Sequence, residues 1–428
     1  MKITSIKGFA DIFPGEVEIW QSVEATARRV FNSYNFSEVR IPILEKTELF
    51  SRSIGETTDI VEKEMYTFED RDSRGGGDTT ETTKLTLRPE GTAGVVRAYV
   101  ESEMYKIEPV RKLYYMGPMF RRERPQKGRM RQFHQIGAEA LGRSDPYIDA
   151  EILLLLSDFF SAVALTEPSL QINSLGCSDC RPKYRELLLA FLKGRENLLC
   201  ENCRRRIDRN PLRALDCKEP GCIEATKDAP SILDSLCAAC REHFETVQRL
   251  LRQTGVGFTL NPRMVRGLDY YCRTTFEWTT TRLGSQSAVA AGGRYDGLVQ
   301  ELGGPAIPGV GFAMGVERLT MLLRLQEGAM AKGPELFVVW VGEKARDWAF
   351  PIVHRLRQKG IAVEMEGEAR SLKSQMRRAD KFKAVSVLIV GDDELANGRA
   401  VLRDMATKQQ QEIGLDRIET ELMARKAS

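Results

Sequence analysis

Apolar positions recur at helical spacing and then at strand spacing along the N-terminal part of the chain. Residues 16–34 carry apolar side chains three or four positions apart, which predicts an amphipathic helix. Short runs of alternating apolar residues, typical of strands, follow at 36–44, 64–70, 84–89, 111–120 and 131–142. Because strand runs outnumber helices and seldom alternate with them, we expect an antiparallel sheet.

The longest apolar run, residues 152–165, is too short and too interrupted to span a bilayer, so it predicts a buried helix. The N-terminal stretch contains two lysines but no apolar run behind them, and we therefore expect no secretory signal. These observations predict a cytoplasmic protein, in a compartment that keeps thiols reduced.

Two changes of pattern divide the rest of the chain. Residues 177–240 are basic and rich in cysteine with few strand signals, and strand-like segments return at 257–278. After the Gly333–Pro334 pair, three short apolar strands alternate with helical stretches, which favours a small α/β domain with a partly parallel sheet. The predicted domains are residues 1–328, with a cysteine-rich insertion at 175–245, and residues 334–428.

Composition narrows the class of protein. The chain has 428 residues, of which 42% are hydrophobic and 29% charged, as in a globular protein of several domains. Its net charge of +3 gives no global basic field, so any polyanionic partner must be met by local patches. The sequence contains no P-loop, no G-x-S-x-G and no H-E-x-x-H motif, which argues against most hydrolase classes.

A cluster of positive charge runs from Arg121 to Arg131, with Glu123 as its only acid. An isolated run of this kind is typical of a solvated hairpin. Here two strand-like segments flank it, so the arginines are expected to project onto a common face. Arginine grips phosphate oxygens bidentately, and Phe133 is available to stack on a base. The pattern therefore favours a site for a polyphosphate nucleotide.

Two further stretches carry candidate chemistry. In 86–94 a strand ends in Arg-Pro-Glu-Gly-Thr, where Glu90 suits an ammonium group and Thr92 can hydrogen-bond beside it. Thr92 is also expected to be the N-cap of the helix that follows. In 266–277 an arginine, an aspartate and two tyrosines share a strand-like run, although alternating tyrosines alone more often pack in a core.

Together these stretches resemble the histidyl-tRNA synthetases, which are class II aminoacyl-tRNA synthetases, over essentially the whole chain. Residues 36–70, 119–142 and 309–319 are similar to the three class II motifs. RGLDYY at 266–271 and AAGGRYDGL at 290–298 resemble the two signatures of the histidine enzymes. The resemblance implies an α+β fold: a class II catalytic domain with a mixed, mostly antiparallel sheet, the cysteine-rich insertion, and a small α/β anticodon-binding domain.

The resemblance also implies a reaction. Histidine and ATP give histidyl-adenylate and pyrophosphate with the help of Mg²⁺, and histidine then passes to the 3′-end of tRNA(His). A homodimer formed through the first motif is implied as well. Glu139 and Tyr271 are implied to address the imidazole ring, and Tyr270 to line the pocket.

The implied residue roles fall into four groups. The catalytic cations are Arg121, Arg266 and Arg318. The ATP contacts are Arg121, Glu123, Arg129, Phe133 and Arg318. The histidine contacts are Glu90, Thr92, Gln135, Glu139, Arg266, Tyr270 and Tyr271. The residues that read the acceptor end of the tRNA are Arg124 and Gln126.

A basic helical stretch lies in the C-terminal domain at residues 369–383. Its composition fits a solvated helix face as well as a surface that contacts phosphates. With a tRNA substrate implied, contact with the tRNA backbone is the better interpretation.

Two segments depart from the family pattern. Residues 73–83 form a loop longer and richer in Gly and Thr than expected, to which we assign no function. The insertion holds eight of the nine cysteines. Cys177-x₂-Cys180 and Cys200-x₂-Cys203, nineteen residues apart, have zinc-ribbon spacing, and Cys217, Cys222, Cys237 and Cys240 form a second, looser quartet. We expect structural zinc, with ordinary reduced thiols as the alternative.

Two other functions compete with the ligase. One is a synthetase-like regulatory subunit that binds histidine without aminoacylation; the retained arginines and the C-terminal domain argue against it. The other is a zinc-dependent RNA-binding protein that uses the fold only as a scaffold.

Overall fold

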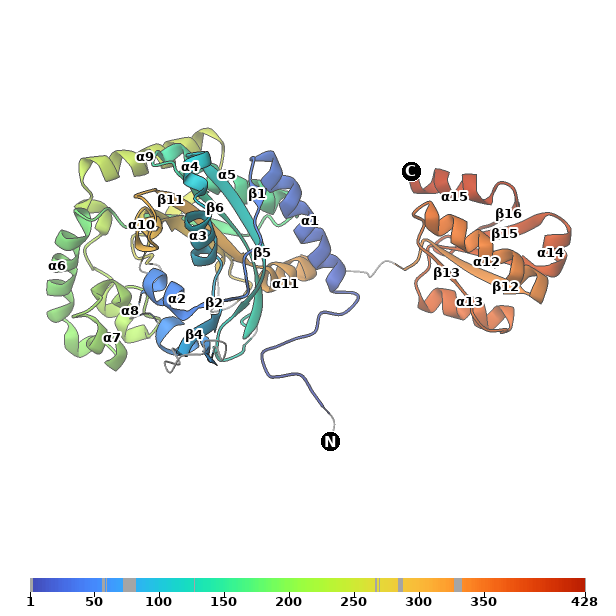
Figure 1. Ribbon diagram of the computed structural model, residues 1–428, viewed down its shortest axis with the longest axis horizontal. Coiled ribbons are helices and arrows are strands. Elements are labelled where there is room, and N and C mark those ends of the chain that lie inside the picture. The colour runs from blue at the N-terminus through green and yellow to red at the C-terminus, as the bar shows by residue number, and fades with distance from the viewer. Residues whose placement is uncertain are drawn as a thin grey trace, which may run out of the picture. The chain divides into compact units, whose positions relative to one another are not determined.

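The computed structural model describes residues 3–55, 58, 60–71, 82–126, 128–265, 268, 270–283, 288–326 and 333–427. The chain divides into two compact units, Met1–Gly328 and Ala329–Ser428 (Figure 1). Among the described helices, none is both long enough and apolar enough to cross a membrane.

An eight-stranded sheet forms the centre of the first unit. In spatial order its strands are β1 (Ser37–Glu38), β5 (Arg111–Phe120), β6 (Gln132–Leu141), β11 (Gly309–Gly315), β10 (Ala288–Arg294), β9 (Cys272–Thr279), β7 (Ser169–Ser174) and β8 (Phe258–Leu260). The pairs β1/β5 and β7/β8 are parallel and the other neighbours are antiparallel. The mixed, mostly antiparallel sheet expected from the resemblance is confirmed.

Strand β6 shows how the sequence separates the two faces of this sheet. Ile136, Ala138 and Ala140 belong to the main hydrophobic core, whereas the alternate residues Phe133 and Gln135 line a cavity. Successive side chains of a strand point to opposite faces, so one strand serves both the core and the site.

Helices cover the core face of the sheet. This layer comprises α1 (Val17–Ser33), α5 (Pro146–Ala162), α9 (Ala238–Gln253) and α11 (Val316–Gln326) (Figure 1). The predicted amphipathic helix is α1, whose buried residues include Trp20, Val23 and Ala27. The long apolar run forms α5, which begins at a Pro whose preceding Asp145 accepts a hydrogen bond from the Tyr147 N–H.

Smaller elements complete this unit. A three-stranded antiparallel sheet has the order β2 (Leu44–Lys46), β4 (Thr82–Leu87) and β3 (Tyr66–Arg71). The remaining elements outside the insertion are α2 (Thr47–Ile54), η1 (Ile60–Glu64), α3 (Thr92–Glu101), α4 (Met104–Ile107) and α10 (Leu298–Glu301). The run predicted as one strand at 36–44 is split: Ser37–Glu38 pairs with β5, and Leu44 begins β2 beyond Pro42, which has no N–H to donate.

The insertion between β7 and α9 is helical. It contains α6 (Cys180–Lys193), η2 (Glu196–Leu198), α7 (Glu201–Arg206), η3 (Pro211–Ala214), α8 (Pro220–Ala225) and η4 (Ile232–Ser235). These elements share a small core of their own, in which Tyr184, Leu188 and Ile207 pack with buried cysteines. Figure 1 shows α6, α7 and α8 gathered at one side of the unit, with α9 leading back to the sheet.

The second unit contains a five-stranded sheet. Its strand order is β13 (Val363–Met365), β12 (Leu336–Val341), β14 (Ser386–Gly391), β15 (Arg399–Asp404) and β16 (Gln410–Gly414). The first three strands are parallel and the last two are added antiparallel. Its helices are α12 (Glu343–Gln358), α13 (Leu372–Lys381), α14 (Asp392–Ala396) and α15 (Ile418–Ala427). The predicted small α/β domain with a partly parallel sheet is confirmed.

Candidate functional site

A cavity of about 310 Å³ lies against the central sheet on the face away from the helical layer. Its walls come from strands β6, β10 and β11, from the connection between β5 and β6, from the segment before β9, and from the starts of α3 and α11. The residues predicted from sequence that line it are Glu90, Thr92, Arg121, Glu123, Arg129, Phe133, Gln135, Tyr270, Tyr271 and Arg318. Residues up to about 230 positions apart in the chain therefore meet in one site.

Two of the arginines are held by main-chain oxygens. Arg121 Nε donates to the Pro89 carbonyl at 2.9 Å, and Arg318 donates from Nε to Gly128 O at 3.0 Å and from Nη1 to Ala288 O at 2.6 Å. Burial lowers the pKa of both guanidinium groups. Even so, their charge is retained, because an arginine side chain ordinarily loses its proton only far above neutral pH. These fixed cations are suited to bind an anion.

A third arginine, Arg129, faces the same cavity. Its Nε contacts the carboxylate of the buried Glu123, and its Nη2 lies 3.9 Å from Glu64 Oε1. Burial is the largest cause of the lowered pKa of Arg318, and the positive charges of Arg129 and Arg121 lower it further. The three cations therefore share one electrostatic environment.

An aromatic ring lies next to these cations. The Cζ atom of Arg121 lies 5.2 Å from the centroid of the Phe133 ring, in cation–π geometry. Phe133 comes from β6 and pairs with Met119 of β5, so the ring is carried by a rigid hairpin. The cavity thus places a stacking surface beside its positive charge.

The acid Glu90 is bound to the start of helix α3. Its two carboxylate oxygens accept the N–H groups of Thr92, at 2.7 Å, and Ala93, at 2.9 Å. Burial raises the pKa of Glu90, and the two N–H groups and Arg121 oppose that rise. The expectation that Thr92 is the N-cap is wrong: Thr92 is the first helical residue, because the Glu90 carboxylate satisfies the free N–H groups in its place.

Glu139 lies below the cavity wall and is fully buried. Thr92 Oγ1 donates to its Oε1 at 2.6 Å, and the hydroxyl of Tyr295 bonds to its Oε2. Burial raises the pKa of Glu139 to about 8, against the effect of these two hydrogen bonds. Gly311 stands opposite it on β11, which leaves room for the carboxylate.

Two polar atoms at the cavity have no hydrogen-bond partner among the described residues. They are Oε1 of Gln135 and the hydroxyl of Tyr270, both buried. The ring of Tyr270 packs against that of Tyr271 with centroids 4.7 Å apart. Buried polar groups are normally paired, so these atoms point to a small polar ligand.

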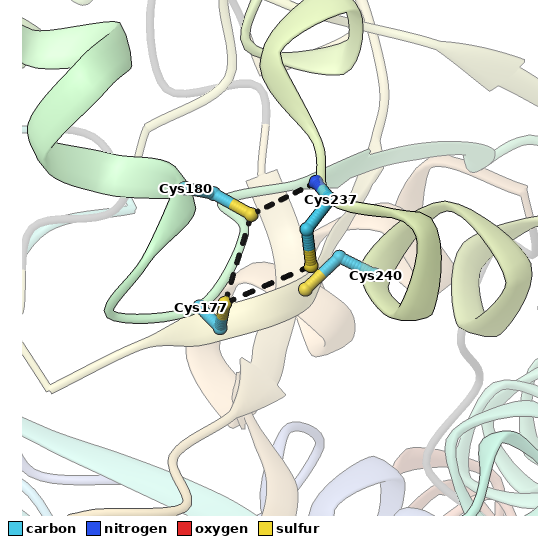
Figure 2. A group of neighbouring side chains, drawn as sticks. All are labelled: Cys177, Cys180, Cys237 and Cys240. Carbon is cyan, nitrogen blue, oxygen red and sulfur yellow. Dashed lines mark hydrogen bonds between the residues drawn. The ribbon is translucent and has the colours of Figure 1, made fainter.

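The eight cysteines of the insertion form two clusters. One contains Cys177, Cys180, Cys237 and Cys240, and the other contains Cys200, Cys203, Cys217 and Cys222. In each, the sulfurs lie within 4.8 Å of one another. Figure 2 shows the four side chains of the first cluster pointing toward one another from the start of α6 and the start of α9.

The grouping of cysteines by sequence spacing is therefore wrong. The first CxxC joins the last, and the second joins the Cys217–Cys222 pair. The physical reason is that α6 leaves the sheet where α9 returns to it, so the two ends of the insertion meet and the middle forms a second cluster.

Comparison with known proteins identifies the family. Residues 8–319 match the family described as histidyl-tRNA synthetase, and residues 335–425 match an anticodon binding domain. The chain belongs to the histidyl-tRNA synthetase family. The resemblance seen in the sequence is thereby confirmed.

Relatives of this family match along their whole length. A histidine–tRNA ligase of Geobacter sulfurreducens is 60% identical, over 96% of this chain and 97% of its own length. One from Geobacter metallireducens is 59% identical, over 97% and 98%. The crystal structure of the apo histidyl-tRNA synthetase of S. aureus is 33% identical, with a TM-score of 0.79 over 98% of this chain and all of the other.

Three predicted residues of the synthetase site that the structure describes do not line the cavity, and a fourth, Arg266, lies outside the described residues. Arg124 and Gln126 are exposed in the β5–β6 loop, and Glu139 lies beneath the wall. The loop at 73–83 also falls largely outside the described residues.

Sequence reasoning missed two contributors to this synthetase site. Tyr295 supports Glu139 from below, and it stands in the AAGGRYDGL signature, which was the available signal. Glu317 lines the cavity and accepts the His134 N–H at 2.9 Å, which ties α11 to β6. It adjoins Arg318 in the third motif, but no spacing rule distinguishes it from a solvated helix residue.

Proposed function

We infer that this protein is a histidine–tRNA ligase, which activates histidine with ATP and transfers it to the 3′-end of tRNA(His). The match of residues 8–319 to the histidyl-tRNA synthetase family, together with relatives of this name that match over nearly their full length, carries the conclusion, and the anticodon binding domain agrees with it. Three arginines around one cavity that also holds unpartnered polar atoms support it.

Histidine-dependent exchange between ATP and labelled pyrophosphate tests this function. We expect exchange with histidine alone among the amino acids, and charging of tRNA(His) on addition of the tRNA. Binding of histidine without exchange would point to a regulatory subunit instead. Binding of RNA with neither activity would point to the scaffold function.

We propose that the nucleotide occupies the side of the cavity with the three arginines. Arg121 contacts the α-phosphate, Arg129 the outer phosphates, and Arg318 closes the opposite side, while Phe133 stacks on adenine. Glu123 holds Arg129 in place through their ion pair. The chemistry that Mg²⁺ would supply, if it binds together with ATP, is neutralisation of the charge on the outer phosphates.

We propose that histidine binds on the side with Glu90 and the tyrosines. Glu90, Thr92 and Gln135 hold the α-amino and carboxylate groups, and Tyr270 packs beside them. Glu139 and Tyr271 address the ring. A neutral imidazole has one donor and one acceptor, so a site that pairs both rejects apolar side chains strongly.

The reaction follows from this placement. A carboxylate oxygen of histidine attacks the α-phosphorus, the bond from that phosphorus to the bridging oxygen breaks, and pyrophosphate leaves. Negative charge grows on the non-bridging oxygens of the α-phosphate, next to Arg121. Because the Pro89 carbonyl already holds this arginine in place, Arg121 need not reorient as the charge develops. Arg266 is proposed as the second cation at this point. A ribose hydroxyl of the terminal adenosine then attacks the carbonyl carbon, and AMP leaves.

We propose that tRNA contacts both units. Arg124 and Gln126 are exposed in the β5–β6 loop at the mouth of the site, where they can read the acceptor end. Helix α13 and the segment before it present Arg370, Lys373 and Arg377 at the surface of the anticodon-binding domain. Phosphate contacts of this kind position a nucleic acid without reading its sequence.

A homodimer, a cytoplasmic location and structural zinc complete the proposal. Ile43, Leu44 and Phe68 are exposed in or beside the strands β2 and β3, which the first class II motif supplies to the three-stranded sheet, and large exposed apolar groups are typical of an interface. All nine cysteines are free thiols, as a reducing compartment requires. Zinc is the ion that suits clusters of four thiolates.

A further inference from the structure

The two cysteine clusters have the spacing of tetrahedral metal sites. A tetrahedron of sulfurs at a zinc–sulfur distance of about 2.3 Å has edges of about 3.8 Å. In the first cluster, Cys177 Sγ lies 3.6 Å from Cys180 Sγ and 4.0 Å from Cys237 Sγ. In the second, Cys200 Sγ lies 3.9 Å from Cys217 Sγ. These distances are far longer than a disulfide bond and close to the tetrahedral edge.

Main-chain N–H groups point at the sulfurs in both clusters. Cys237 N donates to Cys180 Sγ at 3.2 Å, and Cys200 N donates to Cys222 Sγ at 3.1 Å (Figure 2 shows the first). Donors of this kind stabilise a thiolate more than a thiol. Each cluster therefore offers four sulfur ligands with supporting hydrogen bonds, and four thiolates leave no open position for catalysis.

We propose that the insertion binds two structural zinc ions in nested sites. The outer ion is held by Cys177, Cys180, Cys237 and Cys240, and the inner ion by Cys200, Cys203, Cys217 and Cys222. This division of the cysteines between two ions rests on the structural zinc proposed above and specifies its ligands. It does not depend on the ligase function.

The outer ion joins the two ends of the insertion beside the active site. Just before Cys177, the main chain of Leu175 and Gly176 exchanges hydrogen bonds with Arg273, at 2.7 and 2.8 Å. Gly176 has a φ of +64°, and a Cβ at this position would lie 2.6 Å from Cys180 Cβ. Only glycine fits there and allows the ligands to come together. Arg273 is two residues from Tyr271, and the outer ion therefore braces the start of β9, which directly follows the proposed histidine contact.

The inner ion holds a different part of the insertion. It fixes the segment between Cys203 and Cys217, which supplies Arg209 and Leu212 to a second cavity of about 580 Å³. This cavity shares Leu268 and Tyr271 with the catalytic cavity. Loss of the inner ion is expected to disturb this wall and to leave the Arg273 contacts in place.

Metal analysis of the full-length protein, purified under reducing conditions without chelator, tests the proposal. We expect two zinc ions per chain and, in X-ray absorption at the zinc edge, four sulfur neighbours at about 2.3 Å. Fewer than two ions, or nitrogen and oxygen in the first shell, would overturn it. This measurement needs no variant and so does not depend on the folding of one.

Paired variants test the nesting. Cys180→Ser with Cys240→Ser removes two ligands of the outer site alone, and we expect one zinc per chain. If the cysteines were instead grouped by sequence spacing, the two substitutions would remove one ligand from each site, and no zinc would be expected. Cys272→Ser is the control, since Cys272 is half-buried outside both clusters, and two ions are expected. Two ions, or none, in the outer-site variant would reject the nested arrangement.

Steady-state kinetics test the brace. The outer-site pair should raise the KM for histidine at least about fivefold more than Cys200→Ser with Cys203→Ser, because only the outer ion adjoins the main-chain hydrogen bonds to Arg273, two residues after Tyr271. Equal KM values in the two variants would reject the brace. Pyrophosphate exchange and zinc content, both measured on the unmodified protein, separate the two proposals. A protein that catalyses exchange but contains no zinc refutes the metal sites. A protein that contains zinc but catalyses no exchange refutes the ligase function.

Discussion

At the scale of single residues, the site is built from charged groups removed from water. Glu90 and Glu139 are buried, and burial raises the pKa of each. Arg121 and Arg318 are fixed by main-chain oxygens. Groups in such surroundings interact strongly with a ligand, because little solvent screens them.

Glu139→Gln tests the histidine side of the site. The variant should raise the KM for histidine by about 5- to 100-fold, the range for a buried hydrogen-bonding group left without its partner, with little change in the KM for ATP. Glu48→Gln, at an exposed ion pair on α2, is the matched control. An equal rise in both KM values would assign Glu139 to the nucleotide instead.

The same variant should change how stability depends on pH. The pKa of Glu139 is about 8 in the folded protein and near 4.5 unfolded, so the folded state keeps a proton that the unfolded state releases. Glu139 therefore contributes its full stabilisation of the folded state below about pH 4.5. This stabilisation is lost as the pH rises to about 8. The melting temperature of the wild type minus that of Glu139→Gln should fall over this interval; a constant difference would contradict the raised pKa.

Arg318→Ala tests the nucleotide side. Loss of one fixed cation at the developing charge should lower pyrophosphate exchange about 100- to 1,000-fold. Arg324→Ala, on the same helix but half exposed and paired with Glu16, should stay within about twofold of the wild type. Similar losses in both variants would indicate damage to α11 rather than to catalysis.

At the scale of elements, the alternation of strand residues decides what the sheet can hold. The β6 residues Ile136 and Ala138 fill the core, while Gln135 and Glu139 serve the site. The neighbouring strand β11 places small residues beside them, because larger side chains would fill the space of the buried carboxylate.

Gly311→Ala tests this close approach. A Cβ at this position would lie 1.8 Å from Glu139 Oε2 and 2.5 Å from Ala138 O, so the strands must move apart. We expect a loss of about 1–3 kcal/mol in the free energy of unfolding and a higher KM for histidine. Gly257→Ala, where a Cβ meets no atom within 4 Å, is the control. Unchanged melting and KM in Gly311→Ala would show that the gap is not required.

At the scale of the whole molecule, two units divide the work of one ligase. The catalytic cavity lies within Met1–Gly328, and the surface proposed for the anticodon arm lies within Ala329–Ser428. Adenylate formation and tRNA binding are therefore separable by mutation.

Lys373→Glu with Arg377→Glu tests this division. Reversal of two exposed charges at α13 should raise the KM for tRNA by about tenfold or more and leave pyrophosphate exchange unchanged. Lys344→Glu with Lys408→Glu makes the same change of charge elsewhere on the unit and should have little effect. If both pairs weaken charging alike, overall charge rather than α13 is responsible.

Phe68→Asp tests the dimer. The side chain is 49% exposed on β3, and a charge there should weaken self-association about 30-fold or more, as for an interface residue worth 2 kcal/mol. Sedimentation over a range of concentrations measures this. Ile107→Asp, at a site 76% exposed outside the first motif, is the control. Association unaffected by Phe68→Asp would move the interface elsewhere.

The sequence by itself determined the order of elements, the family and the residues of most of the site. Periodicity of apolar residues is a local signal, so α1, α5, β5 and β6 could be placed from it. The motifs named Arg121, Arg129, Phe133 and Arg318, because the chemistry of phosphate binding restricts the residue types that serve it.

Tertiary structure alone decided which distant groups meet. The capping of α3 by Glu90, the support of Glu139 by Tyr295, and the nested cysteine clusters all depend on where chain segments cross. The spacing of cysteines along the chain shows how many residues separate them. It does not show which of them the fold brings together. The sequence therefore predicted the cysteines as a metal-binding set, but only the meeting of the starts of α6 and α9 determined how they divide between two clusters.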